Sequence, residues 1–262
     1  MKKIFGFLLL GLLSLPLFGC GTSVGIYADA DKYLAGNQTY SENVSSLDID
    51  WISGSVTLIE DETIEGVKIE ESTNLTDEKE LVHSYMNNGD LKIKFFASGH
   101  RRKWSTPFKK DLTITYKPGL ENIRIELTSG SCKAASISST NCDIDITSGS
   151  VKIDSLISEK VSTDATSGKI EIYKIETKEF TSDMTSGTLI ADFISVEKAS
   201  FNLTSGHVEM TLPEEGGIVK VSKTSGSIVA KRECSIDNNT YTFGSGNADI
   251  NVSMTSGKII IN

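Results

Sequence analysis

Apolar and polar residues alternate along most of residues 44–262, a period of two that is typical of strands with one buried face. The alternation predicts these inward positions: Ile123, Ile125 and Leu127; Cys142, Ile144 and Ile146; Val161, Thr163 and Ala165; Phe180, Ser182 and Met184; Ala199, Phe201 and Leu203. One further inward position per unit is expected at Ile137, Leu156, Ile175 and Ile194. The period argues against helical repeats.

A Thr-Ser-Gly triplet punctuates this alternation at 128–130, 147–149, 166–168, 185–187, 204–206, 224–226 and 255–257, with a variant Gly244-Ser245-Gly246. Successive glycines are 19 or 20 residues apart until a short final step of 11. A unit of this length is too short for a four-stranded propeller blade. We therefore predict an all-β, single-stranded parallel β-helix, or β-solenoid, whose equivalent strands stack at a spacing of about 4.8 Å.

Each Ser-Gly pair is expected at the same corner of its coil. Gly would supply a positive φ there, and the hydroxyls of Thr and Ser would bond backbone groups along the stack. The predicted structural turns are Gly54, Gly130, Gly149, Gly168, Gly187, Gly206, Gly226, Gly246 and Gly257. Crossover rules make right-handed coiling the default.

The predicted β-helix domain spans residues 44–262, divided into irregular early coils with long insertions (44–127) and regular Thr-Ser-Gly coils (128–262). The early coils would cap one end of the stack, as solenoids require. The chain finishes on residues 258–262, which we expect to form a last strand on an open end, either an aggregation hazard or a docking edge.

The N-terminal segment predicts where in the cell the protein is located. Residues 1–19 combine Lys2 and Lys3 with an apolar run and are expected to be a signal peptide, and Leu17-Phe18-Gly19-Cys20 resembles the bacterial lipobox. We therefore predict lipidation at Cys20, a tether over 20–43, and an extracytoplasmic lipoprotein of the bacterial cell membrane. The alternative is an uncleaved anchor helix that happens to end in a cysteine.

Composition excludes several functions. The formal net charge is -9, and removing the signal peptide makes the chain more acidic, so we predict no nucleic-acid partner. With three His and four Cys in the whole chain, no catalytic set, cofactor site or metal site is predicted. Cys132 and Cys142 fall on inward positions and are expected to be small buried hydrophobes, while Cys234 lies in an irregular coil.

The recurring Ser-Gly-x-apolar-x-apolar coils follow a lipobox and the run Leu112-Thr113-Ile114-Thr115-Tyr116-Lys117-Pro118. Together these features resemble a bacterial putative-adhesin family of unknown function, over about Val44 to Asn262. The resemblance implies a single-chain β-helix on a secreted or surface-anchored protein, in some cases encoded beside envelope-stress genes. It transfers no catalytic or binding residue.

A basic and aromatic segment interrupts this acidic chain at His100-Arg101-Arg102-Lys103-Trp104, with Lys109-Lys110 shortly after it. Arg101, Arg102, Lys103 and Trp104 form a candidate binding site for anionic envelope polymers, glycans or lipid headgroups. The alternative is a solvated loop between strands.

A polar column precedes the corners, at Glu126, Asp145, Asp164, Asp183 and Asn202. We interpret it as a solvated charge ladder that discourages edge pairing. Calcium recruitment and a polysaccharide-cleaving site are the alternatives.

The predicted function is a membrane-anchored lipoprotein whose β-helical surface serves adhesion or binding to a protein, glycan or envelope polymer. One alternative is an accessory or sensor component of an envelope-stress system. Another is a β-helical carbohydrate-active enzyme. The sequence determines neither the ligand nor the oligomeric state.

Overall fold

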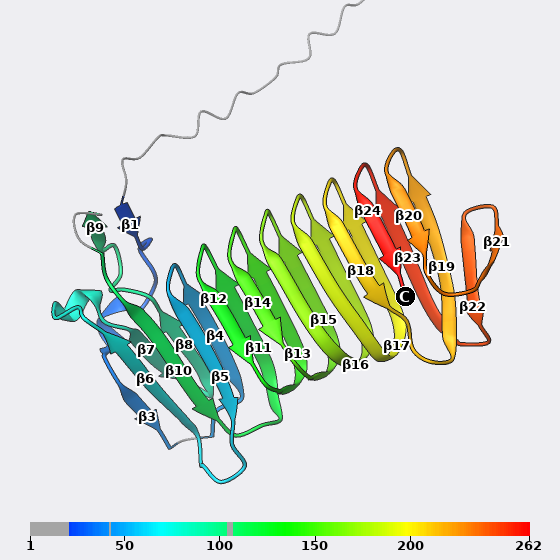
Figure 1. Cartoon of the computed structure of the whole chain (residues 1–262). Coiled ribbons are helices and arrows are strands. Elements are labelled where there is room, and N and C mark those ends of the chain that lie inside the picture. Colours follow the sequence, from blue (N-terminus) through cyan, green and yellow to red (C-terminus); the bar gives the residue numbers. More distant parts are fainter. Residues whose placement is uncertain (1–20, 42, 104–106) are drawn as a thin grey trace, which may run out of the picture.

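The computed structural model describes residues 21–41, 43–103 and 107–262. Within this part the chain is all-β, with 24 strands and two short 3-10 helices, η1 (Ala30–Lys32) and η2 (Glu78–Glu80). The strands stack into an elongated body whose corners form a row along its upper edge in Figure 1. The all-β class predicted from the alternation is confirmed.

Each coil contributes one strand before its corner and one after it. The strands before the corner are β4 (Ser46–Trp51), β11 (Leu120–Leu127), β13 (Ile137–Ile146), β15 (Leu156–Ala165), β19 (Gly216–Lys223) and β23 (Ala248–Met254). The strands after the corner are β5 (Ser55–Glu60), β12 (Ser131–Ala134), β14 (Ser150–Ile153), β18 (His207–Thr211), β20 (Ser227–Ala230) and β24 (Lys258–Ile261). The two longest strands, β16 (Lys169–Met184) and β17 (Thr188–Leu203), follow one corner and continue to the next.

Successive coils in the middle of the stack pair in parallel, one repeat apart. Ile144 pairs with Thr163, and Thr163 pairs with Ser182. Ser182 pairs in turn with Phe201. All four side chains are buried, and the Thr163 hydroxyl donates to the Thr181 carbonyl at 3.4 Å. The inward column predicted from the alternation is thus observed, and its Thr hydroxyl has a hydrogen-bond acceptor.

The inward position predicted at Ile194 is wrong. The register between β16 and β17 shifts by one residue, so that Ile175 pairs with Phe193. Phe193 is 2% exposed and Ile194 is 56% exposed. The shift lies beside Lys174, whose φ of 49° is left-handed. A second shift restores the register at Glu176 and Ser195, so this β-bulge changes the direction of the side chains only at Phe193 and Ile194.

The corner glycines stack on one another. The carbonyl of Gly149 accepts a hydrogen bond from the Lys169 amide at 3.0 Å, and a Cβ on Gly168 would lie 2.6 Å from the same oxygen. The hydroxyls of Ser129, Ser148 and Ser167 donate to backbone carbonyls of the neighbouring coil as predicted, for example Ser167 to the Thr147 carbonyl at 3.2 Å. Close approach between coils is therefore the reason for glycine at this corner.

The predicted positive φ is present at Gly54, Gly187, Gly206, Gly226 and Gly257 but not at Gly130, Gly149 or Gly168. Gly246 is not part of the row. It lies between β22 (Thr240–Gly244) and β23, where a Cβ would meet the carbonyl of Gly216. Only β23 lies between Gly246 and the corner glycine Gly257, which accounts for the short step in glycine spacing.

The order of the coils in space differs from their order in the sequence at the C-terminal end. β24 pairs in parallel with both β18 and β20, and β23 pairs with both β17 and β19. The last coil of the chain lies between two earlier coils, as the red strands between yellow and orange in Figure 1 show. The open end predicted for residues 258–262 is therefore wrong, because both edges of β24 are paired.

The same inversion occurs at the N-terminal end. β4 lies between β8 (Asp90–Lys94) and β11, and β5 lies between β10 (Lys110–Tyr116) and β12. The first coil in the sequence is thus the second coil in space. The long insertion after β5 supplies the end coil.

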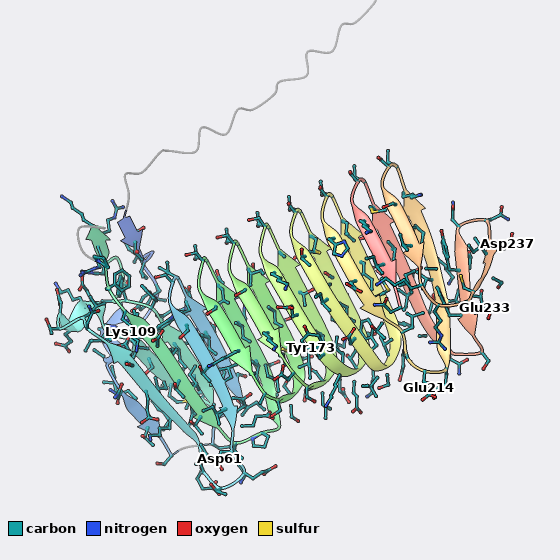
Figure 2. All side chains as sticks on the ribbon, in the orientation of Figure 1. Asp61, Lys109, Tyr173, Glu214, Glu233 and Asp237 are labelled. Carbon is teal, nitrogen blue, oxygen red and sulfur yellow. The ribbon has the colours of Figure 1, made fainter. Side chains whose placement is uncertain are left out.

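Antiparallel strands cover both ends of the stack. At the N-terminal end they are β6 (Val67–Thr73), β7 (His83–Asn87), β2 (Leu34–Ala35) and β3 (Gln38–Tyr40). At the C-terminal end β22 pairs with β19 and with β21 (Ser235–Asp237). The sheet is therefore mixed rather than purely parallel as predicted, because short hairpins provide the caps that a parallel stack needs. Figure 2 shows Glu214, Glu233 and Asp237 around the C-terminal end, where charge discourages edge pairing.

Residues 21–41 belong to this folded body. They were expected to be an irregular tether, yet β2 pairs with β7 and β3 pairs with β6. The Tyr40 hydroxyl lies 2.9 Å from the Ser84 hydroxyl, and the rings of Tyr27 and Tyr33 are 4.6 Å apart. These tyrosines pack on the cap, so the tether prediction needs correction for these residues.

Candidate functional site

The basic segment forms the short strand β9 (Arg101–Lys103) at the N-terminal end of the stack. Alternation along the strand separates its side chains. Arg101 and Lys103 are exposed. The Arg102 side chain points toward the body of the protein, where its Nη1 lies 2.6 Å from the Glu80 carboxylate. Trp104, the fourth predicted binding residue, lies outside the described residues.

β9 is paired with β1 (Gly21–Ser23), the first described strand. The antiparallel register places Gly21 opposite Lys103 and Ser23 opposite Arg101. Arg101, Arg102 and Lys103 therefore lie on a paired strand and not in a free loop. Two of its cations are exposed beside the point where the described chain begins.

Lys110, which follows the basic segment in the sequence, is buried. Its Nζ donates to the Glu71 carboxylate and, at 2.8 Å, to the Glu80 carbonyl. Three ring centroids surround the ammonium, 5.2 Å away in Trp51, 5.0 Å in Phe95 and 5.1 Å in Phe96. Burial lowers the pKa of Lys110 to about 8, against the opposing effect of Glu71. This cation is an internal structural element and is not available to a ligand.

Glu80 connects this buried pair to the exposed strand. Its backbone carbonyl accepts from Lys110, and its carboxylate binds Arg102 and lies 3.3 Å from the His100 ring. Charge-assisted hydrogen bonds of this kind are stronger than neutral ones. The sequence analysis did not predict that Lys110 is buried. A signal was present, because strand alternation places Lys110 on the same face as the buried residues Leu112 and Ile114.

The polar column is continuous across the coils. Glu126 pairs with Asp50 and Asp145, Asp145 with Asp164, and Asp164 with Asp183. The pKa of Asp164 is raised chiefly by partial burial and then by the negative charges of Asp183 and Asp145. The pKa of Glu126 is raised in the same way, by partial burial and then by the charge of Asp50. These directions are expected where like charges stack one coil apart. The predicted column of stacked acidic side chains is therefore observed.

The column ends in neutral donors. Asn202 pairs with Asp183 in the ladder, and its amide donates to the Asp183 carboxylate at 2.9 Å. Ser253 on β23 takes the next place beyond Asn202. Carboxylate acceptors therefore lie beside amide and hydroxyl donors along one line.

A groove of about 500 Å³ runs along this column just below the corner row. Its lining is Asp145, Asp164, Ala165, Thr166, Asp183, Met184, Thr185, Asn202, Leu203, Thr204, Ser253 and Thr255. Carboxylates accept hydrogen bonds, and amides and hydroxyls both donate and accept them. Such a groove suits an extended polar ligand that meets hydrogen-bonding groups at the same register position of successive coils.

The remaining chemistry is sparse. Cys132, Cys142 and Cys234 are free thiols, and burial raises the pKa of Cys132 to about 12. Within residues 21–41, 43–103 and 107–262, no three or more His, Cys, Asp or Glu side chains are arranged as a metal-ligand group. None of the helices in this same part of the chain is long and apolar enough to cross a membrane. The predicted lipidation site, Cys20, lies outside the described residues.

Several solved structures are similar to this chain. A putative cell adhesion protein from Clostridium sporogenes is 16% identical, with 88% of this chain and 99% of that chain covered and a TM-score of 0.41. A putative adhesin from Bacteroides fragilis is 12% identical, with 86% and 96% covered and a TM-score of 0.49. A putative lipid binding protein from Parabacteroides distasonis is 13% identical, with 87% and 97% covered and a TM-score of 0.49. None of the three is named as an enzyme.

A family model described as Toastrack DUF4097 matches residues 56–262. No curated protein matches the sequence.

Proposed function

Because the chain belongs to the Toastrack DUF4097 family, we propose that it is a membrane-anchored extracytoplasmic lipoprotein whose stacked body is a binding surface for a protein, glycan or envelope polymer. The family match covers most of the range over which the sequence resembles putative adhesins, so that resemblance is confirmed. The anchor rests on the lipobox-like ending at Cys20 and the signal-like segment before it. In its regular part the body is a β-solenoid, a description supported by the parallel register of β11 through β18.

The groove along the polar column is the observation that carries the binding proposal. Asp164, Asp183 and Asn202 present hydrogen-bonding groups from three consecutive coils at one place in the register. The coils are fixed to one another by backbone ladders, so the groups are held in place before a ligand arrives. Preorganisation of this kind reduces the entropy lost on binding. A polar polymer such as a glycan fits the groove because its hydroxyls recur along its length.

The proposal is tested by binding of the body, residues 21–262, to an array of glycans, teichoic-type polymers and envelope proteins. The groove variant replaces three carboxylates with amides of similar shape, at Asp145, Asp164 and Asp183. The control variant removes the same charge from exposed positions outside the groove, at Glu62, Glu121 and Glu233.

We expect at least one class of ligand on the array to bind the wild-type protein and the control variant. The groove variant should bind that ligand at least tenfold more weakly, since a hydrogen bond to a charged group contributes about 1.5–3 kcal/mol. Equal binding by the two variants would show that the groove is not the binding site. No binding to any class would contradict the adhesin function and favour a sensor or accessory role.

A further inference from the structure

The N-terminal strand and the basic strand form a two-stranded ribbon, here the β1–β9 ribbon, consisting of residues 21–26 and 99–103. Beyond the ladder that pairs Ser23 with Arg101, the Val24 amide donates to the His100 carbonyl at 3.0 Å. The Gly99 amide donates to the Gly25 carbonyl at 3.1 Å. Figure 1 shows the ribbon at the N-terminal end of the stack, on the same side as the corner row.

The two faces of the ribbon differ in chemistry. Thr22 is 3% exposed, and Arg102 is bound to Glu80, so these side chains attach the ribbon to the cap. Arg101 and Lys103 are exposed on the ribbon. The exposed surface is therefore cationic on a chain whose net charge is -9.

An apolar side chain stands at the far end of the ribbon. Ile26 is 93% exposed, the highest value among the exposed large hydrophobic residues of the described chain. It lies next to Gly99, since a Cβ on that glycine would be 3.5 Å from Ile26 Cγ1. Cations combined with an exposed aliphatic side chain are typical of surfaces that contact the headgroup region of a bilayer.

The chain enters the ribbon next to its cations. Gly21 pairs with Lys103 and is bonded directly to Cys20. One extended residue spans at most about 3.6 Å. An acyl chain on Cys20 would therefore bring Lys103 to the surface of the bilayer in which that chain is inserted.

We propose that the β1–β9 ribbon binds the phosphate headgroups of anionic lipids through Arg101 and Lys103, with Ile26 inserted at the interface. This inference rests on the lipid anchor in the proposed function. Each Lys or Arg near an anionic surface strengthens binding about fivefold. The ribbon acts as a second attachment beside the anchor and orients the N-terminal cap toward the membrane, with the C-terminal coils away from it.

The experiment uses the full chain, purified from membranes and reconstituted in vesicles of phosphatidylcholine alone or of an equal mixture with phosphatidylglycerol. Hydrogen–deuterium exchange is followed for amides of 21–27 and 99–103. The test variant is Arg101→Gln with Lys103→Gln, which keeps Arg102 and its bond to Glu80. The control is Lys133→Gln with Lys198→Gln, two exposed lysines elsewhere on the stack. Thermal melts of both variants check the fold, and the mass of the N-terminal peptide reports acylation of Cys20.

We expect ribbon amides of the wild type and the control to exchange at least fivefold more slowly in the anionic vesicles. The difference should shrink in high salt and disappear in the test variant. Equal exchange in both kinds of vesicle overturns the inference, even where Cys20 is acylated and the anchor holds. Unmodified Cys20 contradicts the anchor, and slower exchange in anionic vesicles then still supports the ribbon. Protection by soluble polyglycerol phosphate but not by vesicles would assign the ribbon to an envelope polymer and overturn the membrane inference.

Discussion

The amide of Lys258 donates a 2.9 Å hydrogen bond to the carbonyl of Gly206. This bond places the final strand directly on the coil that ends in β18, although β19 to β23 intervene in the sequence. The Gly257 carbonyl in turn accepts from the Ser227 amide at 3.0 Å. The C-terminal coil is thus an interior coil, and β20 is the strand at the end of this side of the stack.

Truncation of the two equivalent isoleucines tests this order. Ile259 on β24 is 0% exposed, and Ile228 on β20 is partly buried. Ile259→Ala should lower the free energy of unfolding by about 2–5 kcal/mol, the usual cost of a cavity in a core. Ile228→Ala should cost less than half as much, because one side of its coil faces solvent. Urea denaturation measures both, and the reverse ranking would place β24 at the end.

A methyl group at a corner tests the contact between stacked glycines. Gly168→Ala would place a Cβ 2.6 Å from the Gly149 carbonyl oxygen and against the end of the Ile146 side chain. We expect a loss of about 1–3 kcal/mol in the free energy of unfolding, since overpacking forces the coils apart. Gly25→Ala is the matched control, with no atom within 4 Å of its Cβ position. Equal melting temperatures for the two variants would show that the coils do not need glycine for this contact.

The buried lysine predicts an alkaline dependence of stability. The pKa of Lys110 is lowered to about 8 from 10.5, chiefly by burial. Between these values the unfolded chain binds a proton that the folded chain does not, so stability rises with pH. At about 1.4 kcal/mol per pKa unit, the gain from pH 8 to 9.5 is roughly 2 kcal/mol.

The double variant Lys110→Met with Glu71→Gln should lack this rise, and the amide retains an acceptor for Val82, whose backbone N–H lies 3.0 Å from Glu71 Oε2. Urea denaturation at several pH values in this window gives the two slopes. Parallel slopes would mean that Lys110 does not titrate in the folded protein.

Neutralising the middle of the polar column should stabilise the protein. Partial burial, and after it the neighbouring carboxylates, raise the pKa of Asp164, so its ionised form is disfavoured in the folded state. Asp164→Asn should raise the free energy of unfolding at neutral pH by a few tenths of a kcal/mol, about the effect of one like-charge cross-strand pair. The gain should vanish as the pH falls below the unfolded value of 3.8, where both states are protonated.

Asp154→Asn is the control for this effect, because the Asp154 carboxylate is exposed, lies 3.7 Å from Lys152 Nζ and is not part of the polar column. Melting temperatures at neutral and acid pH compare the two. A larger gain from Asp154→Asn would contradict repulsion along the column.

Local rules predicted the regular coils well. Alternation identified the inward column from Ile144 to Phe201, and the triplets identified the corners. Both follow from short-range physics, because side-chain parity is fixed by the strand itself. The exception at Phe193 and Ile194 arises from two register shifts, one on each side of the Ile175–Phe193 pair, which compensate and leave the spacing of the corner glycines unchanged.

Long-range order was not predictable in the same way. Parallel pairing of β24 is equally compatible with an end coil and an interior coil, since both place Ile259 and Ile261 inward. Alternation along the strand places Lys110 on the same buried face as Leu112, so its burial could have been predicted. A charged side chain, however, is usually expected to be exposed to solvent. Only the partners Glu71 and Glu80, which lie far from it in the sequence, make burial acceptable. The ion pair of Arg102 was hidden for the same reason.

The location of the protein, the orientation of the ribbon and the access of the groove to envelope ligands all depend on the lipid anchor. The mass of the mature N-terminus is therefore the most direct test of the proposed function. The chain is expressed in a bacterium, recovered from the membrane fraction, and its N-terminal peptide is sequenced and weighed, with Cys20→Ser as the comparison. We expect a chain that begins at Cys20 and carries acyl groups, and a Cys20→Ser chain that lacks them. A mature chain that begins elsewhere with an unmodified thiol, or recovery in the cytosol, would contradict it.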